Sequence, residues 1–321
     1  MPFTDPITEN VVVRLTQPTA TSLTAEPQNR FVSSREAFLV FASDRAGRMA
    51  PFRVNLRTGA LQQLADPTAL SPRAFALDSS EKKLFFIDNS VLQEVDVQHL
   101  RSRTVAENVS GFHVAGRTNE IVILTNNRLE HLQPKGSTVI AEGVASRGFV
   151  SPSGTGCAFC RESDAGGHEL WYAAFGATPA LLAKGNISCP YWRPDGQTLL
   201  FLRQVDRGDY VASEVHEAPL DGSAERFVCR TSQYAAFAPN GDGSVFVGAS
   251  RSKAQPHIML LLRDLNRELT LCEHHSSHPD TVNPQFSPNS QRVYYQSDHE
   301  GKSAIYSVNV ELLIEPTQDR D

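Results

Sequence analysis

The sequence lacks long apolar runs and clusters of basic residues. No stretch approaches the roughly 20 apolar residues that a membrane-spanning helix needs. The first residues, MPFTDPITENVVVRLT, have no basic start, no apolar core and no small-residue cleavage site, which does not fit a secretory signal. The net charge is −6, and no Lys/Arg run offers a footprint for phosphates. We therefore expect a cytoplasmic protein that binds neither membranes nor nucleic acid.

Cysteine is also scarce, and its number is odd. The chain has five cysteines at irregular spacing, which fits reduced thiols better than a disulfide framework. Cys157 and Cys160 form a CxxC pattern, but residues three apart in a strand point to opposite faces of the sheet. We therefore interpret them as two unrelated structural thiols.

Helix signals are nearly absent, and a repeated strand unit takes their place. The clearest copy, NPQFSPNSQRVYYQSD at residues 283–298, reads as a turn, a short apolar segment, a Ser-Pro-Asn corner and an alternating strand. Six degraded copies precede it, at residues 236–250, 191–203, 149–162, 113–126, 75–88 and, faintest, 32–43. A period of about 36 to 49 residues made of strands indicates a propeller.

These repeats predict an all-β fold, a seven-bladed β-propeller that forms a single domain over residues 1–321. Each copy is followed by a strand, a polar turn and another strand, as hairpins require. The last blade offers three strands, and residues 11–15, VVVRL, precede the first complete unit. We expect this N-terminal strand to close the last blade and remove its exposed edge, in the sheet that holds residues 293–296. Residues 17–28 are rich in Pro and Thr and predict a loop into blade one.

A candidate site follows from the architecture, because propellers bind small ligands at a mouth of the central channel. With the repeats aligned on the corner, the position five residues earlier marks the beginning of each innermost strand. These ring positions are Asn29, Pro72, Gly111, Arg147, Cys189, Tyr234 and Asn283. The last four lie on blades four to seven, and we expect their side chains to converge on one cavity. The alternative is a solvated rim without a ligand.

Three arginines are candidates for binding an acidic ligand at this mouth. Arg30 and Arg73 each follow a ring position, and Arg147 occupies one. Guanidinium groups bind carboxylates bidentately. Because residues at a rim are usually exposed, we expect Arg147 to be exposed and free to bind an acidic sugar. The alternative is that the arginines pair with acidic residues on neighbouring blades.

A histidine-rich loop directly before the last repeat is a candidate metal site. His274, His275 and His278 lie within five residues, with Asp280 beside them. Imidazoles and a carboxylate can bind a transition metal, although this spacing is not one of the strong zinc patterns. The alternative is surface or hydrogen-bonded histidines. His113 and His168 are weaker candidates, with a structural role as their main interpretation.

Four segments resemble a known family. They are RLTQP (14–18), FASDRAGRMAPFRVNLRTGALQQLAD (41–66), TLCEHHSSH (270–278) and FSPNSQRVYYQSDHEGKSAIYSVNV (286–310). Together they resemble the oligogalacturonate lyases of pectin-degrading bacteria, over nearly the whole chain. The resemblance implies a cytoplasmic seven-bladed propeller that cleaves short galacturonate oligomers by β-elimination with a divalent metal, manganese. The SD-x-x-G-x-x-x-I-Y pattern also occurs in TolB-like and peptidase propellers.

The positions that carry the family's chemistry hold other residues here. The resemblance implies a catalytic His before the Pro of blade five, where this chain has Cys189-Pro190. It implies a metal-binding His at the beginning of blade six, where Tyr234 stands. It also implies a Gln-x-x-His-x-His ligand run, whose matching positions are His278, Thr281 and Asn283. We therefore expect no tight manganese site of the family kind.

Two hypotheses about function remain open at this point. β-Elimination on a uronate needs a base for the C5 proton and neutralisation of the adjacent carboxylate. Cys189 is a base only if a cation lowers its pKa, and Tyr234 only as a phenolate helped by Arg147. Arg30, Arg73, Arg147 and Asn283 are the candidate substrate-binding residues. The chain is thus an acidic-oligosaccharide lyase with a remodelled site, or a non-catalytic propeller that serves as a binding or protein-interaction module, TolB- or WD40-like.

Overall fold

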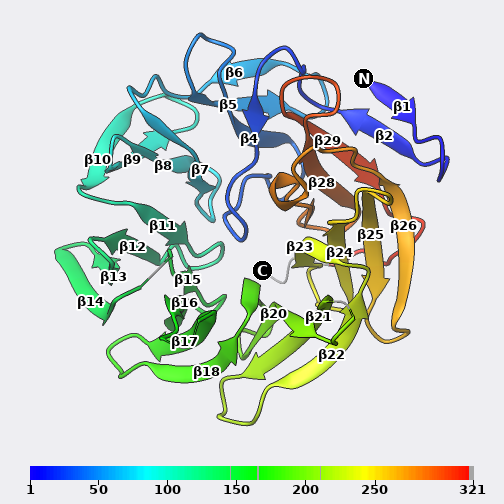
Figure 1. Cartoon of the computed structure of the whole chain (residues 1–321). Coiled ribbons are helices and arrows are strands. Elements are labelled where there is room, and N and C mark those ends of the chain that lie inside the picture. The colour runs from blue at the N-terminus through cyan, green and yellow to red at the C-terminus, as the bar shows by residue number, and fades with distance from the viewer. Residues whose placement is uncertain (145, 165, 210, 318–321) are drawn as a thin grey trace.

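The structure, a computed structural model, describes residues 1–144, 146–164, 166–209 and 211–317. Seven antiparallel sheets, the blades, surround a central channel (Figure 1). Within these residues the chain has one short helix, the 3-10 helix η1 (Pro279–Thr281), and no helix long and apolar enough to cross a membrane. The predicted all-β, seven-bladed propeller is therefore confirmed.

The strands of each blade follow one another from the channel to the rim. Blade one contains β3 (Ser22–Leu23), β4 (Phe38–Ser43), β5 (Ala50–Asn55) and β6 (Leu61–Gln63). Blade two contains β7 (Leu70–Leu77), β8 (Lys83–Asp88), β9 (Val91–Asp96) and β10 (Ser102–Ala106). Blade three contains β11 (Gly111–Val114), β12 (Ile121–Thr125), β13 (Arg128–Gln133) and β14 (Gly136–Glu142). Blade four contains β15 (Phe149–Val150), β16 (Gly156–Glu162), β17 (His168–Ala174) and β18 (Ala180–Gly185).

The remaining blades repeat this order. Blade five contains β19 (Ile187–Trp192), β20 (Thr198–Asp206), β21 (Val211–Pro219) and β22 (Arg226–Thr231). Blade six contains β23 (Tyr234–Pro239), β24 (Val245–Ser250), β25 (His257–Leu262) and β26 (Arg267–Glu273). Blade seven contains β27 (Gln285–Phe286), β28 (Arg292–Ser297), β29 (Ala304–Asn309), β2 (Val11–Arg14) and β1 (Pro2–Thr4).

Blade seven is closed by the N-terminus, as the sequence predicts. β2 pairs antiparallel with β29, with Val12 opposite Val308, and Val12 is buried. The N-terminal strands lie beside the C-terminal strand β29 in Figure 1. β1 adds a fifth strand to this sheet that the sequence did not predict. The closure removes the open edge that β29 would otherwise present.

The core lies between the blades, because each sheet is covered on both faces by its neighbours. The second strands accordingly read as continuous apolar runs; all six residues of β24, VFVGAS, are buried. Cys157 and Cys160 belong to two different core clusters, one on each face of blade four. Both are free thiols, which confirms the interpretation of this CxxC pattern.

The recurring corners fold into similar turns at one end of the channel. In blade seven, Ser287 N donates to Arg292 O (2.7 Å) and Ser290 N to Ser287 O (2.9 Å). In blade six, Asn240 N donates to Val245 O (2.9 Å) in the same way. We call the end of the channel at these corners the lower mouth, and the end at which the innermost strands begin the upper mouth.

Candidate functional site

The innermost strands of several blades are bulged near the upper mouth. In blade five, Cys189 and Pro190 together lie opposite the single residue Phe201. In blade six the pairing shifts between Tyr234 and Ala236. A bulge bends the strand and changes the face to which the next side chains point. Equal spacing from the corner therefore does not give equal orientation toward the channel.

Blade one has a much longer interruption in its innermost strand. Leu23 pairs with Ala42 and Val32 with Leu39, so the eight residues 24–31 lie opposite two residues of β4. This extra backbone leaves the sheet, and Figure 1 shows the blue loop before β4 reaching toward the middle of the ring.

Residues 24–29, TAEPQN, which we call the inner segment, are held by bonds to five of the other six blades. Two bonds are donated by the segment: Glu26 N donates to Arg73 O of blade two (2.9 Å), and Gln28 Nε2 to Pro190 O of blade five (2.7 Å). The other blades donate to it: His113 Nε2 of blade three to Gln28 O (3.2 Å), and Arg147 Nη2 of blade four to Pro27 O. Asn283 Nδ2 of blade seven donates to Thr24 Oγ1 and to Ala25 O (2.9 Å each). The upper mouth is therefore filled by the chain itself. The sequence predicted a plain loop over residues 17–28; strand β3 and the inner segment take up most of it.

Arg147 lies inside this filled mouth. Its Nε forms an ion pair with Glu26 Oε2, and its guanidinium lies over the Phe149 ring, 4.8 Å from the centroid. The Arg147 side chain is 10% exposed and that of Glu26 33%. Burial lowers the pKa of Arg147, and the Glu26 carboxylate opposes that shift. The expectation that Arg147 is exposed and free is wrong, because the inner segment covers and pairs it.

The three candidate arginines do not converge as a set. Burial lowers the pKa of Arg73, the Glu26 carboxylate raises it and the charge of Arg147 lowers it further, so these groups lie close enough to interact. Arg30 points elsewhere and forms an ion pair with Glu81 of blade two at 2.5 Å. The structure thus places Arg73 and Arg147 near Glu26. Arg30 instead pairs with an acidic residue of a neighbouring blade, which is the alternative stated for these arginines.

Cys189 does not have the surroundings of a catalytic base. Its backbone has a φ of 50°, uncommon for a residue with a side chain, at the bulge of β19. Its Sγ lies 3.8 Å from Ala235 O. Burial raises the pKa of the thiol. The Arg251 charge lowers the pKa of Cys189 but does not outweigh burial, so the condition under which Cys189 acts as a base is not met.

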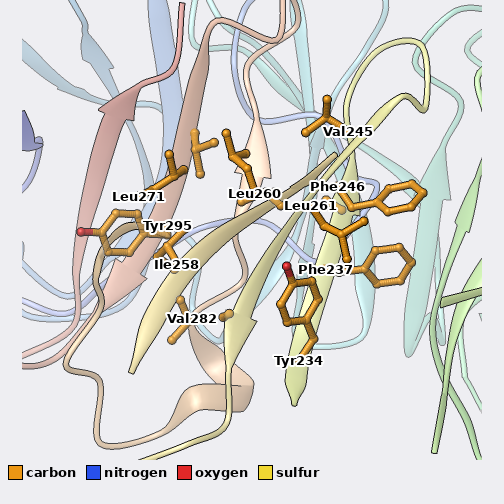
Figure 2. Close-up of a cluster of buried hydrophobic side chains, with 14 of the residues drawn as sticks. Tyr234, Phe237, Val245, Phe246, Ile258, Leu260, Leu261, Leu271, Val282 and Tyr295 are labelled. Atoms are coloured by element: carbon orange, nitrogen blue, oxygen red, sulfur yellow. The ribbon is translucent and has the colours of Figure 1, made fainter. Parts of the chain in front are cut away.

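Tyr234 is a core residue and does not line the mouth. Figure 2 shows its ring among buried side chains such as Phe237, Ile258 and Val282, and it is 2% exposed. Burial raises its pKa well above the ordinary value, and the nearby Glu268 carboxylate raises it further. The expectation that Tyr234 converges with Arg147 on a cavity is wrong, since the ring packs between blades.

Asn283 holds the inner segment in place. Its backbone has a φ of 48° and its side chain is buried. The amide nitrogen donates to the Thr24 hydroxyl and to the Ala25 carbonyl, which joins blade seven to blade one. These two bonds explain why an amide side chain stands at position 283. A role of Asn283 in substrate binding stays a prediction.

The three histidines of the candidate metal loop are dispersed. His274 is buried, its Nε2 donates to Ser250 O (3.1 Å), and burial lowers its pKa to about 4. His275 forms an ion pair with Glu273 at 2.9 Å, and His278 is exposed just before η1. In the part of the chain that the structure describes, no three His, Cys, Asp or Glu side chains are placed to hold one metal ion.

The residues that sequence reasoning missed are Glu26 and Gln28. Glu26 is the one carboxylate in residues 17–28. The composition of that stretch is typical of a loop, so the sequence did not mark this carboxylate as a site residue. His113 has the structural role expected of it. Its Nδ1 accepts from Val150 N (3.1 Å), its Nε2 donates to Gln28 O, and burial lowers its pKa to about 3.

Among the residues that the structure describes, the lower mouth holds a cavity of about 320 Å³. Its walls are corner residues of five blades, among them Pro152, Pro239 and Pro288, and Gln28 and His113 border it on the channel side. A volume near 300 Å³ is at the small end of ligand sites. Within the described residues, the inner segment thus separates the filled upper mouth from this lower cavity.

Comparison with known proteins gives a likeness in fold. No protein-family model matches the chain, and no curated protein matches its sequence. The oligogalacturonate lyase of Vibrio parahaemolyticus superposes with a TM-score of 0.86 at 19% identity, over 97% of this chain and 96% of that one. An oligogalacturonate lyase in complex with manganese gives 0.85 at 19% identity, over 96% and 95%.

A more distant likeness is to TolB from Acinetobacter baumannii. It has a TM-score of 0.52 at 13% identity, over 90% of this chain and 65% of that one. The resemblance to oligogalacturonate lyases that the sequence motifs indicate is thus confirmed for the fold. At these identities the likeness establishes architecture, and the chemistry must be argued from the side chains.

Proposed function

We propose that the chain is a non-catalytic propeller with the oligogalacturonate lyase fold, a binding module without β-elimination chemistry. The observation that carries this proposal is the position of Glu26. Its carboxylate and the inner segment occupy the upper mouth, and Arg147 is already paired there. A uronate oligomer would have to displace this segment before it reached the beginnings of the innermost strands.

The side chains near this mouth also do not supply a base for the C5 proton. A base must be deprotonated near the working pH and within hydrogen-bond reach of its proton. Burial raises the pKa of both Cys189 and Tyr234, so both are protonated at neutral pH. His113 is neutral, but both of its ring nitrogens are engaged by Gln28 and Val150.

The donor set does not fit the manganese ion that the fold implies. Manganese takes carboxylate, carbonyl, water and imidazole ligands. At the positions that match the family's ligand histidines, Tyr234 is packed in the core and Asn283 donates to the inner segment. His278 is exposed beside η1. We therefore derive no step through a metal at this mouth.

The experiment that tests this proposal is a turnover assay on the purified full chain. Saturated and unsaturated di- and trigalacturonate are supplied with Mn²⁺ or with chelator, and formation of unsaturated uronate is followed by ultraviolet absorbance. We expect no absorbance increase above a heat-denatured control in either condition. A Mn²⁺-dependent increase that scales with protein concentration would show that the chain is a lyase.

A further inference from the structure

The upper mouth contains more buried positive charge than negative charge. Arg147 forms an ion pair with Glu26, and Arg73, whose backbone O accepts from Glu26 N at 2.9 Å, lies close enough for the Glu26 carboxylate to raise its pKa. Among the described residues, no second carboxylate forms an ion pair with either arginine. A buried charge is costly unless it is paired and hydrogen-bonded, so this positive charge favours a carboxylate at the place that Glu26 occupies.

Several polar atoms at this mouth are buried without a hydrogen-bond partner in the described structure. They are Arg73 Nε, Arg147 Nη1, Glu26 Oε2 and both amide atoms of Asn29, which is 1% exposed. Buried polar groups are nearly always hydrogen-bonded, and each exception needs an explanation. Three of these five atoms are donors, and two of the three belong to guanidinium groups, which bind oxyanions.

The backbone that carries Glu26 is anchored independently of its side chain. Glu26 N donates to Arg73 O at 2.9 Å, and the Gln28 side chain bonds to Pro190 O at 2.7 Å. Asn283 fixes the other end of the inner segment at Thr24 and Ala25. Shortening the Glu26 side chain therefore vacates the space beside Arg147 while the segment keeps its path.

We propose that Arg73 and Arg147 form a carboxylate-binding site that the chain's own Glu26 occupies. Glu26 acts as an intramolecular ligand, and an external carboxylate such as acetate or the carboxylate of a uronic acid takes its place when it is absent. Carboxylate recognition by guanidinium groups supplies the affinity. The inference concerns binding and is independent of turnover, so a lyase-active chain would overturn the proposed function and leave this site standing.

The test is chemical rescue of the Glu26→Ala variant. Its thermal unfolding is followed while sodium acetate, sodium formate or sodium D-galacturonate replaces sodium chloride at constant ionic strength, with neutral D-galactose as a further control. A ligand that binds the folded state raises Tm with its concentration. We expect a saturable rise in Tm with acetate or formate for Glu26→Ala and none for the wild type, whose site is filled.

Two control variants make the result specific. Glu81→Ala removes the carboxylate of the Arg30 ion pair, which lies away from the mouth, and is expected to show no carboxylate-specific rise. The double variant Glu26→Ala/Arg147→Leu is expected to lose the rise. A rise with galacturonate extends the ligand class to uronic acids; a rise with acetate or formate alone confirms the site and limits it to small carboxylates.

The proposal is overturned if Glu26→Ala responds to acetate and formate no more than to chloride, or if the double variant responds equally. Should Glu26→Ala not fold in chloride, its recovery on refolding is compared in acetate and in chloride. Recovery in acetate alone supports the site. Equal recovery, or none in either, contradicts it.

Discussion

Glu26 of blade one and Arg147 of blade four form an ion pair across the upper mouth of the channel, although their sheets are not neighbours in the ring. The pair exists because residues 24–31 leave the innermost strand of blade one. The ion pair connects the inner segment of blade one to a charged side chain of blade four, on another side of the channel. The inner segment fills the mouth through several backbone and side-chain bonds, and this ion pair is the contact that covers and pairs the Arg147 side chain.

Tyr234 is predicted to stabilise the fold by packing, with no role for its hydroxyl in chemistry. Tyr234→Phe should change the free energy of unfolding by about 1 kcal/mol or less, because the buried hydroxyl has no hydrogen-bond partner in the described structure. Gly248→Ala should cost about 1–3 kcal/mol, because the added methyl group would collide with the Tyr234 ring. Urea unfolding of both variants measures this. Equal losses in the two variants would show that the ring does not pack as described.

His113 and His274 are predicted to make stability fall with pH below about 6.5. Burial lowers their folded pKa values to about 3 and about 4, so the unfolded chain binds more protons as pH falls. This contribution is complete above the unfolded pKa and is lost toward the folded values, with a slope of at most about 1.4 kcal/mol per pH unit for each histidine. The slope is measured by urea unfolding at several pH values between about 7.5 and about 4.

The matched variants for this pH dependence are His113→Gln and His99→Gln. The first should flatten the curve, since it removes one buried neutral imidazole. The second replaces an exposed histidine that contacts Asp96 and should leave the slope close to that of the wild type. Parallel curves for the wild type and His113→Gln would contradict the description of His113.

Removal of residues 1–14 is predicted to open the propeller. Deletion takes away the buried Val12 and the strand β2, and leaves β29 as an unprotected edge. The loss of the Val12 side chain alone is worth about 1.5–3 kcal/mol. We expect a lower Tm and concentration-dependent association in light scattering. Deletion of residues 1–9, which keeps β2, should have a clearly smaller effect; equal effects would mean that β2 does not close the ring.

The fold could be predicted because its determinants are local and repeated. The Ser-Pro-Asn corner of blade seven and its degraded copies form similar turns, and the alternating strand after each corner marks a blade. The orphan segment 11–15 predicts the closure, since a ring with three strands in its last blade needs a fourth. β1 escaped prediction because three exposed residues carry no pattern.

The site could not be predicted to the same degree, because its geometry depends on pairing between distant segments. Alignment on the corner assumes that every innermost strand is regular, but bulges at Cys189 and after Tyr234 turn their side chains away from a shared cavity. The inner segment reads as a loop in the sequence, and nothing local indicates that it crosses the channel. Arg147 was identified as important, while its partner Glu26 was not.

A double-mutant cycle on Glu26 and Arg147 tests the central claim most directly. Unfolding free energies are measured in urea for the wild type, Glu26→Gln, Arg147→Met and the double variant. We predict a coupling of about 1–2 kcal/mol, below the 3–5 kcal/mol typical of breaking a fully buried pair because Glu26 is one-third exposed. The exposed pair of Arg48 and Asp66 serves as the reference cycle and should give a clearly smaller coupling. A coupling of zero between Glu26 and Arg147, with the two single effects simply adding, would contradict the account that the chain's own carboxylate fills the upper mouth.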